Sequence, residues 1–254
     1  MSAMRPLSGK ITVVGIGPGS LEDLTPRAAR AIEESQVVVG YRWYLELIGG
    51  LLEGKTVQAF GMGQEQERAR AAADLAYQGY QVALVSGGDP GVYGMAGPLL
   101  EALLQRGWSR ESGLPVEIVP GVTAATAGAA LLGAPLMQDF AVISLSDRFG
   151  PWELIARRLE AAAASDMVVV LYEPASHLRP RHIEEAQRIL LQHRTGETPV
   201  GVVRDAYRPG EQVVLTSLGQ MLQHSFDMRT VVIVGNSSTK AQGGVMVTPR
   251  QYPS

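Results

Sequence analysis

Three glycine-rich segments hold the residue types best suited to binding a ligand through the backbone. Because glycine has no side chain, a turn built from it can bring backbone N–H groups close to an anionic or nucleotide-like ligand. Each segment follows a short apolar run that contains β-branched residues. The three segments are residues 15–20 (GIGPGS), 86–94 (SGGDPGVYG) and 120–125 (PGVTAA).

The first segment is similar to part of a dinucleotide-binding fingerprint. That fingerprint, Gly-x-Gly-x-x-Gly, has a third glycine where this chain has Ser20. It also expects an acidic residue at the end of the second strand, where this chain has Gly40, Tyr41 and Arg42. Because an arginine can accept the 2′-phosphate of NADP, an NADP-dependent oxidoreductase remains an open alternative. A tight strand-to-helix turn is an equally good interpretation of this segment alone.

The second and third segments carry polar side chains among their glycines. Asp89 can accept hydrogen bonds from a polar ligand, or it can cap the helix that follows. Thr123 likewise either contacts a ligand or caps a helix. The carboxyl ends of parallel strands lie at one edge of a sheet, where open α/β folds bind their ligands. We therefore expect the three segments to converge on one crevice.

The elements that position these segments are predicted from hydrophobic patterning. Short apolar runs that end at glycine or proline are typical of buried parallel strands. Thr25 and Pro26 have the residue types of a helix N-cap and first helical position. Strands alternating with helices predict a right-handed parallel α/β sheet. The predicted strands are 11–14, 37–39, a strand from 56, 82–85 and 116–119, and the predicted helices include 43–52, 65–78 and 92–106.

The second half of the chain repeats this alternation less regularly. We place the domain boundary at Pro120-Gly121, which gives domains 1–121 and 122–254. The turn at residues 208–211 (RPGE) predicts an antiparallel hairpin, so the second sheet should be mixed. The polar tail after Gly235 is predicted to end in irregular structure. The other predicted elements are helices 123–132, 151–163 and 181–193 and strands 140–145, 167–171, 200–203, 213–216 and 231–234.

Composition narrows the classes of function. Of the 254 residues, 46% are hydrophobic and 19% are charged, which predicts a folded chain. No apolar run reaches the roughly 18 residues of a membrane helix, and the N-terminus has no signal-peptide pattern, so we expect a cytoplasmic protein that contacts no membrane. The absence of cysteine excludes disulfides, thiolate metal sites and a cysteine nucleophile. The net charge of −3 does not favour nucleic acid, and the histidine spacing predicts no metal site.

Taken in order, the motifs resemble those of the tetrapyrrole (precorrin) methylases. The resemblance rests on GIGPGS followed by LTPRA, then GGDPGVYG, then VPGVTAA with LLGAPL, and it runs from about Lys10 to Asn236. It implies a two-domain α/β fold with a mainly parallel first sheet, a mixed second sheet and an active-site cleft between the domains. GYRWYLELI, DFAVISLSDRFGPWE and the terminal GNSST are most similar to the branch that methylates C17 of precorrin-3B in cobalamin biosynthesis. Two stretches depart from that pattern: Tyr172-Glu173-Pro174, where relatives carry asparagine before the proline, and Arg148-Phe149-Gly150.

The resemblance also implies S-adenosyl-L-methionine as methyl donor, with S-adenosyl-L-homocysteine as product. An adenosine needs an apolar slot and a few backbone partners, and its amino-acid portion needs polar groups. The family's contacts fall on matching positions of this chain. The implied cofactor-binding residues are Pro18, Gly87, Gly88, Asp89, Val92, Thr123, Ala124, Tyr172, Glu173, Ala206, Thr230 and Val231.

The implied substrate, a polycarboxylate macrocycle, needs positive partners and groups that move protons. Arg148 and Arg204 adjoin predicted strand ends, and we prefer them as substrate-binding residues because arginine pairs a carboxylate with two hydrogen bonds. Arg179, Arg181 and Arg208 are weaker candidates. Asp147 is the candidate catalytic residue, as proton acceptor or hydrogen-bond partner, although it could instead cap the helix near Pro151.

The family is commonly homodimeric, so the resemblance also implies a homodimer. Alternatives within the fold are methylation at another precorrin position, a diphthine synthase and a ribosomal-RNA ribose methyltransferase. The acidic charge balance does not support the RNA enzyme. A nucleotide-binding regulator without catalysis would carry the same loops. The sequence leaves open whether the substrate contains cobalt and whether the chain completes ring contraction.

Overall fold

The computed structural model describes residues 9–175 and 181–250, and the chain divides into two compact units. The first is Met1–Thr123 and the second is Ala124–Ser254, so the division lies two residues beyond the boundary expected from the sequence. Within the described ranges, no helix is both long and apolar enough to span a membrane.

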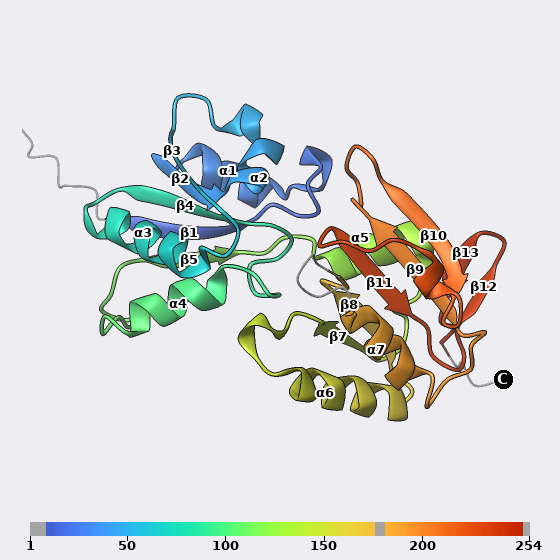
Figure 1. Cartoon of the computed structure of the whole chain (residues 1–254). Coiled ribbons are helices and arrows are strands. Elements are labelled where there is room, and N and C mark those ends of the chain that lie inside the picture. The colour runs from blue at the N-terminus through green and yellow to red at the C-terminus, as the bar shows by residue number, and fades with distance from the viewer. Residues whose placement is uncertain (1–8, 176–180, 251–254) are drawn as a thin grey trace, which may run out of the picture. The chain divides into compact units, whose positions relative to one another are not determined.

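The first unit contains a five-stranded sheet in which every pair of neighbouring strands is parallel (Figure 1). The strand order is β3-β2-β4-β1-β5, so β1 lies between β4 and β5. This confirms the predicted parallel α/β sheet. The strands are β1 Lys10–Gly15, β2 Val37–Tyr41, β3 Thr56–Phe60, β4 Gln81–Ser86 and β5 Val116–Val119.

Helices cover both faces of this sheet (Figure 1). Successive side chains of β1 point to opposite faces: Val13 belongs to the core shared with α3 and α4, and Val14 to the core shared with α1 and α2. The predicted cap of α1 is confirmed, because Thr25 Oγ1 accepts from Ala28 N at 3.1 Å and proline follows it. The helices are α1 Pro26–Glu33, α2 Arg42–Leu47, α3 Glu65–Tyr77 and α4 Ala96–Leu104, with 3₁₀ turns at Leu21–Asp23 and Gly49–Leu51.

Two helices of this unit are shorter than predicted. Helix α2 ends at Leu47 instead of continuing to residue 52. Helix α4 begins at Ala96, four residues later than predicted, because the loop before it has its own hydrogen bonds. Met95 N donates to Ser86 Oγ at 3.2 Å, and Tyr93 has a φ of 53°, outside the helical region.

The second unit contains a five-stranded mixed sheet of order β10-β9-β11-β8-β7 (Figure 1). Strands β7 and β8 are parallel, whereas β11 is antiparallel to both of its neighbours and β10 is antiparallel to β9. The predicted hairpin and mixed sheet are therefore confirmed. The elements are α5 Ala124–Leu132, β7 Phe140–Ser144, a 3₁₀ turn Asp147–Phe149, α6 Trp152–Ala164, β8 Val168–Tyr172, α7 His182–Leu190, β9 Pro199–Arg204, β10 Gln212–Ser217, a 3₁₀ turn Met221–Gln223 and β11 Thr230–Val234.

The tail contains a hairpin that the sequence analysis did not predict, and residues 248–250 after it form no helix or strand. Strands β12 Lys240–Gln242 and β13 Val245–Val247 form a hairpin, and β13 pairs with β6 Gly133–Ala134 to complete a three-stranded sheet. Gly243 and Gly244, with φ of 62° and 81°, make the two-residue turn, as the favoured hairpin geometry requires. Met246 is fully buried in the core of this unit and anchors the hairpin.

Candidate functional site

The three glycine-rich loops of the first unit meet at the carboxyl ends of β4, β1 and β5, as predicted. Gly17 and Gly88 pair across the first two loops, with N–O distances of 3.2 Å for Gly17 N to Gly88 O and 2.9 Å for Gly88 N to Gly17 O. The third loop joins them because Gly121 N donates to the Asp89 carboxylate at 3.1 Å. One connected backbone cluster therefore forms at this sheet edge.

Close packing explains why this cluster consists of glycine. A Cβ atom on Gly121 would lie 2.2 Å from the carbonyl oxygen of Gly88, and one on Gly15 would lie 2.7 Å from that same oxygen. A Cβ atom on Gly87 would lie 2.4 Å from the ring of Tyr44. All three distances are below any normal contact, so the loops converge only without side chains at these positions.

Asp89 joins the second loop to the third. Its Oδ1 accepts from Gly91 N at 2.8 Å, and its Oδ2 accepts from Gly121 N. The alternative that Asp89 caps the next helix is wrong, because the N-cap of α4 is Met95. Of the other candidates in these loops, Pro18 is buried, Val92 is half-buried and Thr123 directly precedes α5.

The candidates of the second unit lie at one edge of its sheet. Strands β7, β8 and β9 run in the same direction, and β11 runs in the opposite direction, so the carboxyl ends of the first three adjoin the amino end of β11. The structure thus brings together residues from four separate stretches of sequence at this edge. They are Asp147 and Arg148 after β7, Tyr172 and Glu173 at the end of β8, Arg204 and Ala206 at the end of β9, and Thr230 and Val231 at the start of β11.

An apolar platform, formed by Ala124, Tyr172, Ala206 and Val231, belongs to this edge. The first three are partly buried and pack against the core cluster that contains Val231. The Tyr172 hydroxyl accepts from Ala125 N at 2.6 Å, so it satisfies one of the backbone donors that the start of α5 leaves without a helical partner. Small side chains beside a phenol ring are residue types that suit an adenine ring, although Val231 itself is only 4% exposed.

Backbone strain is present at the same edge. Glu173, Asp205 and Tyr207 have φ of 49°, 50° and 58°, the left-handed region that residues other than glycine rarely adopt. Glu173 follows β8, and the other two flank Ala206 after β9. Strained backbone of this kind is concentrated at ligand-binding sites, where the surrounding structure enforces it.

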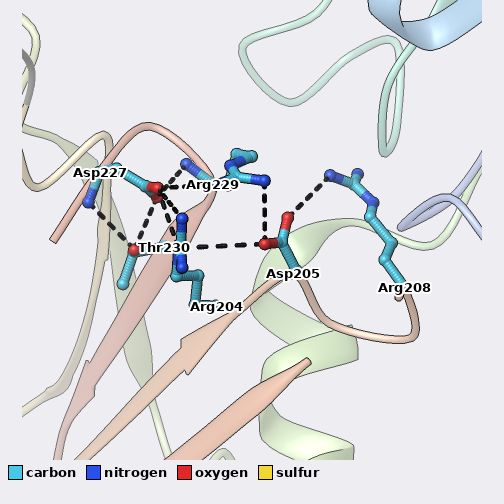
Figure 2. Close-up of polar contacts among 6 residues, drawn as sticks. All are labelled: Arg204, Asp205, Arg208, Asp227, Arg229 and Thr230. Atoms are coloured by element: carbon cyan, nitrogen blue, oxygen red, sulfur yellow. Dashed lines mark hydrogen bonds and ion pairs between the residues drawn. The ribbon is translucent and has the colours of Figure 1, made fainter. Parts of the chain in front are cut away.

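Arg204 lies in a charge network of three arginines and two aspartates (Figure 2). Its Nε donates to Asp227 Oδ2 at 2.9 Å, so Arg204 is already paired within the protein. Asp205 is only 4% exposed and lies 3.1 Å from Arg229 Nη1 and 4.0 Å from Arg208 Nη1. Within this network alone, three positive and two negative side chains leave one net positive charge.

Asp227 stays ionised in this network. Burial alone would raise the pKa of its carboxyl, but hydrogen bonds from Arg229 N, the Thr230 hydroxyl and Arg204 lower the pKa below its usual value. Thr230 is 4% exposed, and its hydroxyl donates to Asp227 Oδ1 at 3.0 Å. The Thr230 backbone N–H also donates to Asp227 O at 3.1 Å, so both its hydroxyl and its N–H are engaged within the protein.

Sequence reasoning missed Arg229 and His182. Arg229 has a side chain that is 41% exposed and contacts both aspartates of the network. His182 Nε2 lies 3.7 Å from Asp147 Oδ2. No local motif marks either residue: Asp205, one partner of Arg229, and Leu145 and Asp147, the partners of His182, are distant from them in sequence. Asp147 opens a 3₁₀ turn and is not the N-cap of α6, which is Pro151, so that alternative is wrong. Arg148 is exposed, and Arg179 lies outside the described residues.

The fold and the candidate site define an α/β protein. Its first unit has glycine loops at one edge of the sheet, and its second unit has polar residues at one edge. Open α/β enzymes bind nucleotide-like ligands at the carboxyl ends of their strands. A sequence model of the tetrapyrrole (corrin/porphyrin) methylases matches residues 10–222, and the chain belongs to that family.

Curated relatives match nearly the whole chain. The cobalt-factor III methyltransferase of Priestia megaterium is 51% identical over 246 residues, which are 97% of this chain and 46% of that longer protein. A probable cobalt-factor III C(17)-methyltransferase of Salmonella typhimurium is 45% identical and covers 95% of this chain and 99% of its own length. A precorrin-3B C(17)-methyltransferase of a Sinorhizobium species is 39% identical, with 97% and 98% coverage.

Solved structures agree with the fold. The methyltransferase CobJ superposes with a TM-score of 0.90 at 37% identity, covering 95% of this chain and all of its own. The uroporphyrin-III C-methyltransferase of Thermus thermophilus, solved with S-adenosylhomocysteine, has a TM-score of 0.70 at 30% identity, with 89% and 97% coverage.

Proposed function

We propose that this chain is an S-adenosylmethionine-dependent C-methyltransferase that methylates C17 of precorrin-3B or of its cobalt-containing counterpart during cobalamin biosynthesis, with contraction of the ring. The observation that carries the proposal is end-to-end similarity to two C(17)-methyltransferases, at 45% and 39% identity, each covered almost completely by this chain. The converging loops of the first unit support a nucleotide-like ligand independently of that similarity.

Each unit, considered by itself, carries residues of the types that S-adenosylmethionine needs. When bound, this molecule supplies an electrophilic methyl group on a sulfonium, so no metal or covalent intermediate is needed. The side-chain-free loop around Gly87 and Gly88 permits close backbone approach, with Pro18, Val92 and Thr123 beside it. The apolar platform suits the adenine ring, and Asp89 and Glu173 are acceptors for the polar groups of the ligand. Alignment of donor and acceptor can supply about 7–11 kcal/mol of the barrier.

The substrate's carboxylates are proposed to bind at the arginines along this sheet edge of the second unit. Arg148 is exposed beside β7. Arg204 is held by Asp227, so its guanidinium contributes a fixed position and charge, and Arg229 extends the same positive surface with a 41% exposed side chain. Asp147 is proposed to take part in moving the macrocycle's protons. These roles rest on the placement of the residues at one sheet edge.

Calorimetry with S-adenosylhomocysteine and NADPH tests the donor assignment. We expect the first to bind with micromolar or better affinity and the second not to bind. Binding of NADPH alone would contradict the proposal and favour an oxidoreductase. Parallel assays with the cobalt-containing and the metal-free substrate would decide which form the enzyme uses.

We also propose a cytoplasmic homodimer, on the basis of family resemblance. Light scattering coupled to size exclusion should give twice the 27.1 kDa chain mass. A single chain mass at micromolar concentration would contradict the dimer.

A further inference from the structure

The His182 imidazole is held in one orientation by three contacts. Its Nδ1 lies 2.8 Å from the carbonyl oxygen of Leu145, at the end of β7. The indole of Trp152 stacks on its face, with ring centroids 4.4 Å apart and planes inclined by 23°. On the opposite edge, Nε2 lies 3.7 Å from Asp147 Oδ2. The ring therefore has contacts to β7, to α6 and to the 3₁₀ turn between them.

These contacts fix which nitrogen can accept a proton. A carbonyl oxygen only accepts hydrogen bonds, so Nδ1 must carry the hydrogen. In the neutral ring Nε2 is then the proton acceptor. Asp147 lies beside Nε2 and can stabilise the imidazolium that protonation creates. The Trp152 ring face, which attracts cations, stabilises the same charge.

His182 lies at the sheet edge that carries the candidate cofactor-binding residues of the second unit. The carbonyl that holds it directly follows β7, whose carboxyl end shares the sheet edge with Tyr172, Glu173 and Ala206. The His182 side chain is 18% exposed and that of Asp147 is 42% exposed, so the pair is partly sheltered but reachable. By contrast, His193 pairs with Glu160 at 2.6 Å after the end of α7, whereas His182 is the first residue of that helix.

We propose that His182 Nε2 accepts the proton that the tetrapyrrole loses when it is methylated, with Asp147 as the positioning residue that stabilises the imidazolium. The inference rests on the proposed function. In the step, an electron pair on a ring carbon forms the new C–CH₃ bond, and the S–CH₃ bond breaks with its pair left on sulfur. The macrocycle gains one positive charge and becomes neutral again when it passes a proton to Nε2. A hydroxide or buffer base removes that proton after product release.

The test compares His182→Asn with His193→Asn. The amide nitrogen of asparagine replaces Nδ1 as the donor to the Leu145 carbonyl, but the variant has no equivalent of Nε2. We expect His182→Asn to lower kcat by about 100-fold or more, with the substrate KM and the affinity for S-adenosylhomocysteine within about twofold of wild type. His193→Asn should retain wild-type kcat. Asp147→Asn should lower kcat by at least about tenfold.

A second readout does not depend on activity. Nitrogen NMR of the full-length protein labelled at histidine should show His182 protonated at Nδ1 in its neutral form. A neutral ring protonated at Nε2 would overturn the inference, as would wild-type kcat in His182→Asn. If the wild-type protein binds no S-adenosylhomocysteine and methylates no tetrapyrrole, the proposed function fails and the inference with it. Normal methylation by His182→Asn refutes the inference alone.

Discussion

At the scale of single residues, Gly121 shows how strongly local space limits the sequence. Its N–H holds Asp89, and a Cβ atom there would lie 2.2 Å from the Gly88 carbonyl oxygen. Gly121→Ala should therefore separate the loops, lowering the free energy of unfolding by about 2 kcal/mol or more and weakening S-adenosylhomocysteine binding at least about tenfold. Urea unfolding and calorimetry would measure the two effects.

Gly97 is the matched control for that substitution. It lies in α4 with no atom within 4 Å of the position that a Cβ would take. Gly97→Ala should leave binding unchanged and stabilise the protein by up to about 1 kcal/mol, because alanine favours the helix. If Gly121→Ala and Gly97→Ala lose equal stability and equal affinity for S-adenosylhomocysteine, crowding at Gly121 is not the cause of the losses.

Asp227 predicts a dependence of stability on pH. The folded-state pKa of its carboxyl is lowered, so the stabilisation is present above the unfolded pKa of about 4 and is lost as the pH falls through the folded pKa. Since the side chain is 36% exposed, solvent screening limits the effect. Asp227→Asn should lower the free energy of unfolding by about 1 kcal/mol at pH 7 and by progressively less below pH 4.

Urea unfolding between about pH 3 and pH 7 checks this dependence. Glu53→Gln, in an exposed turn, is the control and should change stability little at either pH. If the loss of unfolding free energy in Asp227→Asn is the same at every pH, the charge of the Asp227 carboxylate is not the source of the stabilisation.

At the scale of elements, the start of α5 depends on a side chain from another strand. The Tyr172 hydroxyl, at the end of β8, accepts from Ala125 N in the first turn of the helix. Tyr172→Phe removes that acceptor and should lower the free energy of unfolding by about 1 kcal/mol. Thermal or urea unfolding would measure the loss, and Tyr80→Phe, at a 42% exposed position, should have no such effect. Equal stabilities would mean that water replaces the hydroxyl without cost.

The strands could be predicted because their signal is local. Runs such as Val82 to Val85 are short, apolar and bounded by glycine or polar residues. Because every consecutive residue is apolar, the run predicts a strand that is buried on both faces. Strands β12 and β13 escaped prediction because they are short and mostly exposed, and their pairing with Gly133 depends on residues more than 100 positions away. The start of α4 was placed too early because the preceding loop is held by two hydrogen bonds, from Met95 N to Ser86 Oγ and from Ala96 N to Pro90 O.

In the candidate site too, one part could be predicted from the sequence and another could not. Convergence of the glycine loops follows from strand direction alone, and the structure confirms it through the Gly17–Gly88 pair. The contacts of Arg204 and His182 could not be predicted, because Asp227 and Leu145 are distant in sequence from them. Side-chain partners of that kind are set by which strands become neighbours, and strand order is not visible in a local pattern.

At the scale of the whole molecule, each unit has its own cores and its own functional sheet edge. Two apolar clusters on opposite faces of the sheet support the loops of the first unit, and two others support the sheet of the second. The proposed function places the reacting groups where these sheets end, and the apolar cores hold those ends in position.

Transfer of a labelled methyl group tests the central claim most directly. The purified chain would be incubated with S-adenosylmethionine carrying ¹³C in its methyl group, together with precorrin-3B or its cobalt counterpart, and the product examined by mass spectrometry and carbon NMR. If the chain methylates C17, the product should be one labelled methyl group heavier, with that methyl on C17. An equal amount of S-adenosylhomocysteine should form. Label at another carbon of the macrocycle, or no transfer to either substrate, would contradict it.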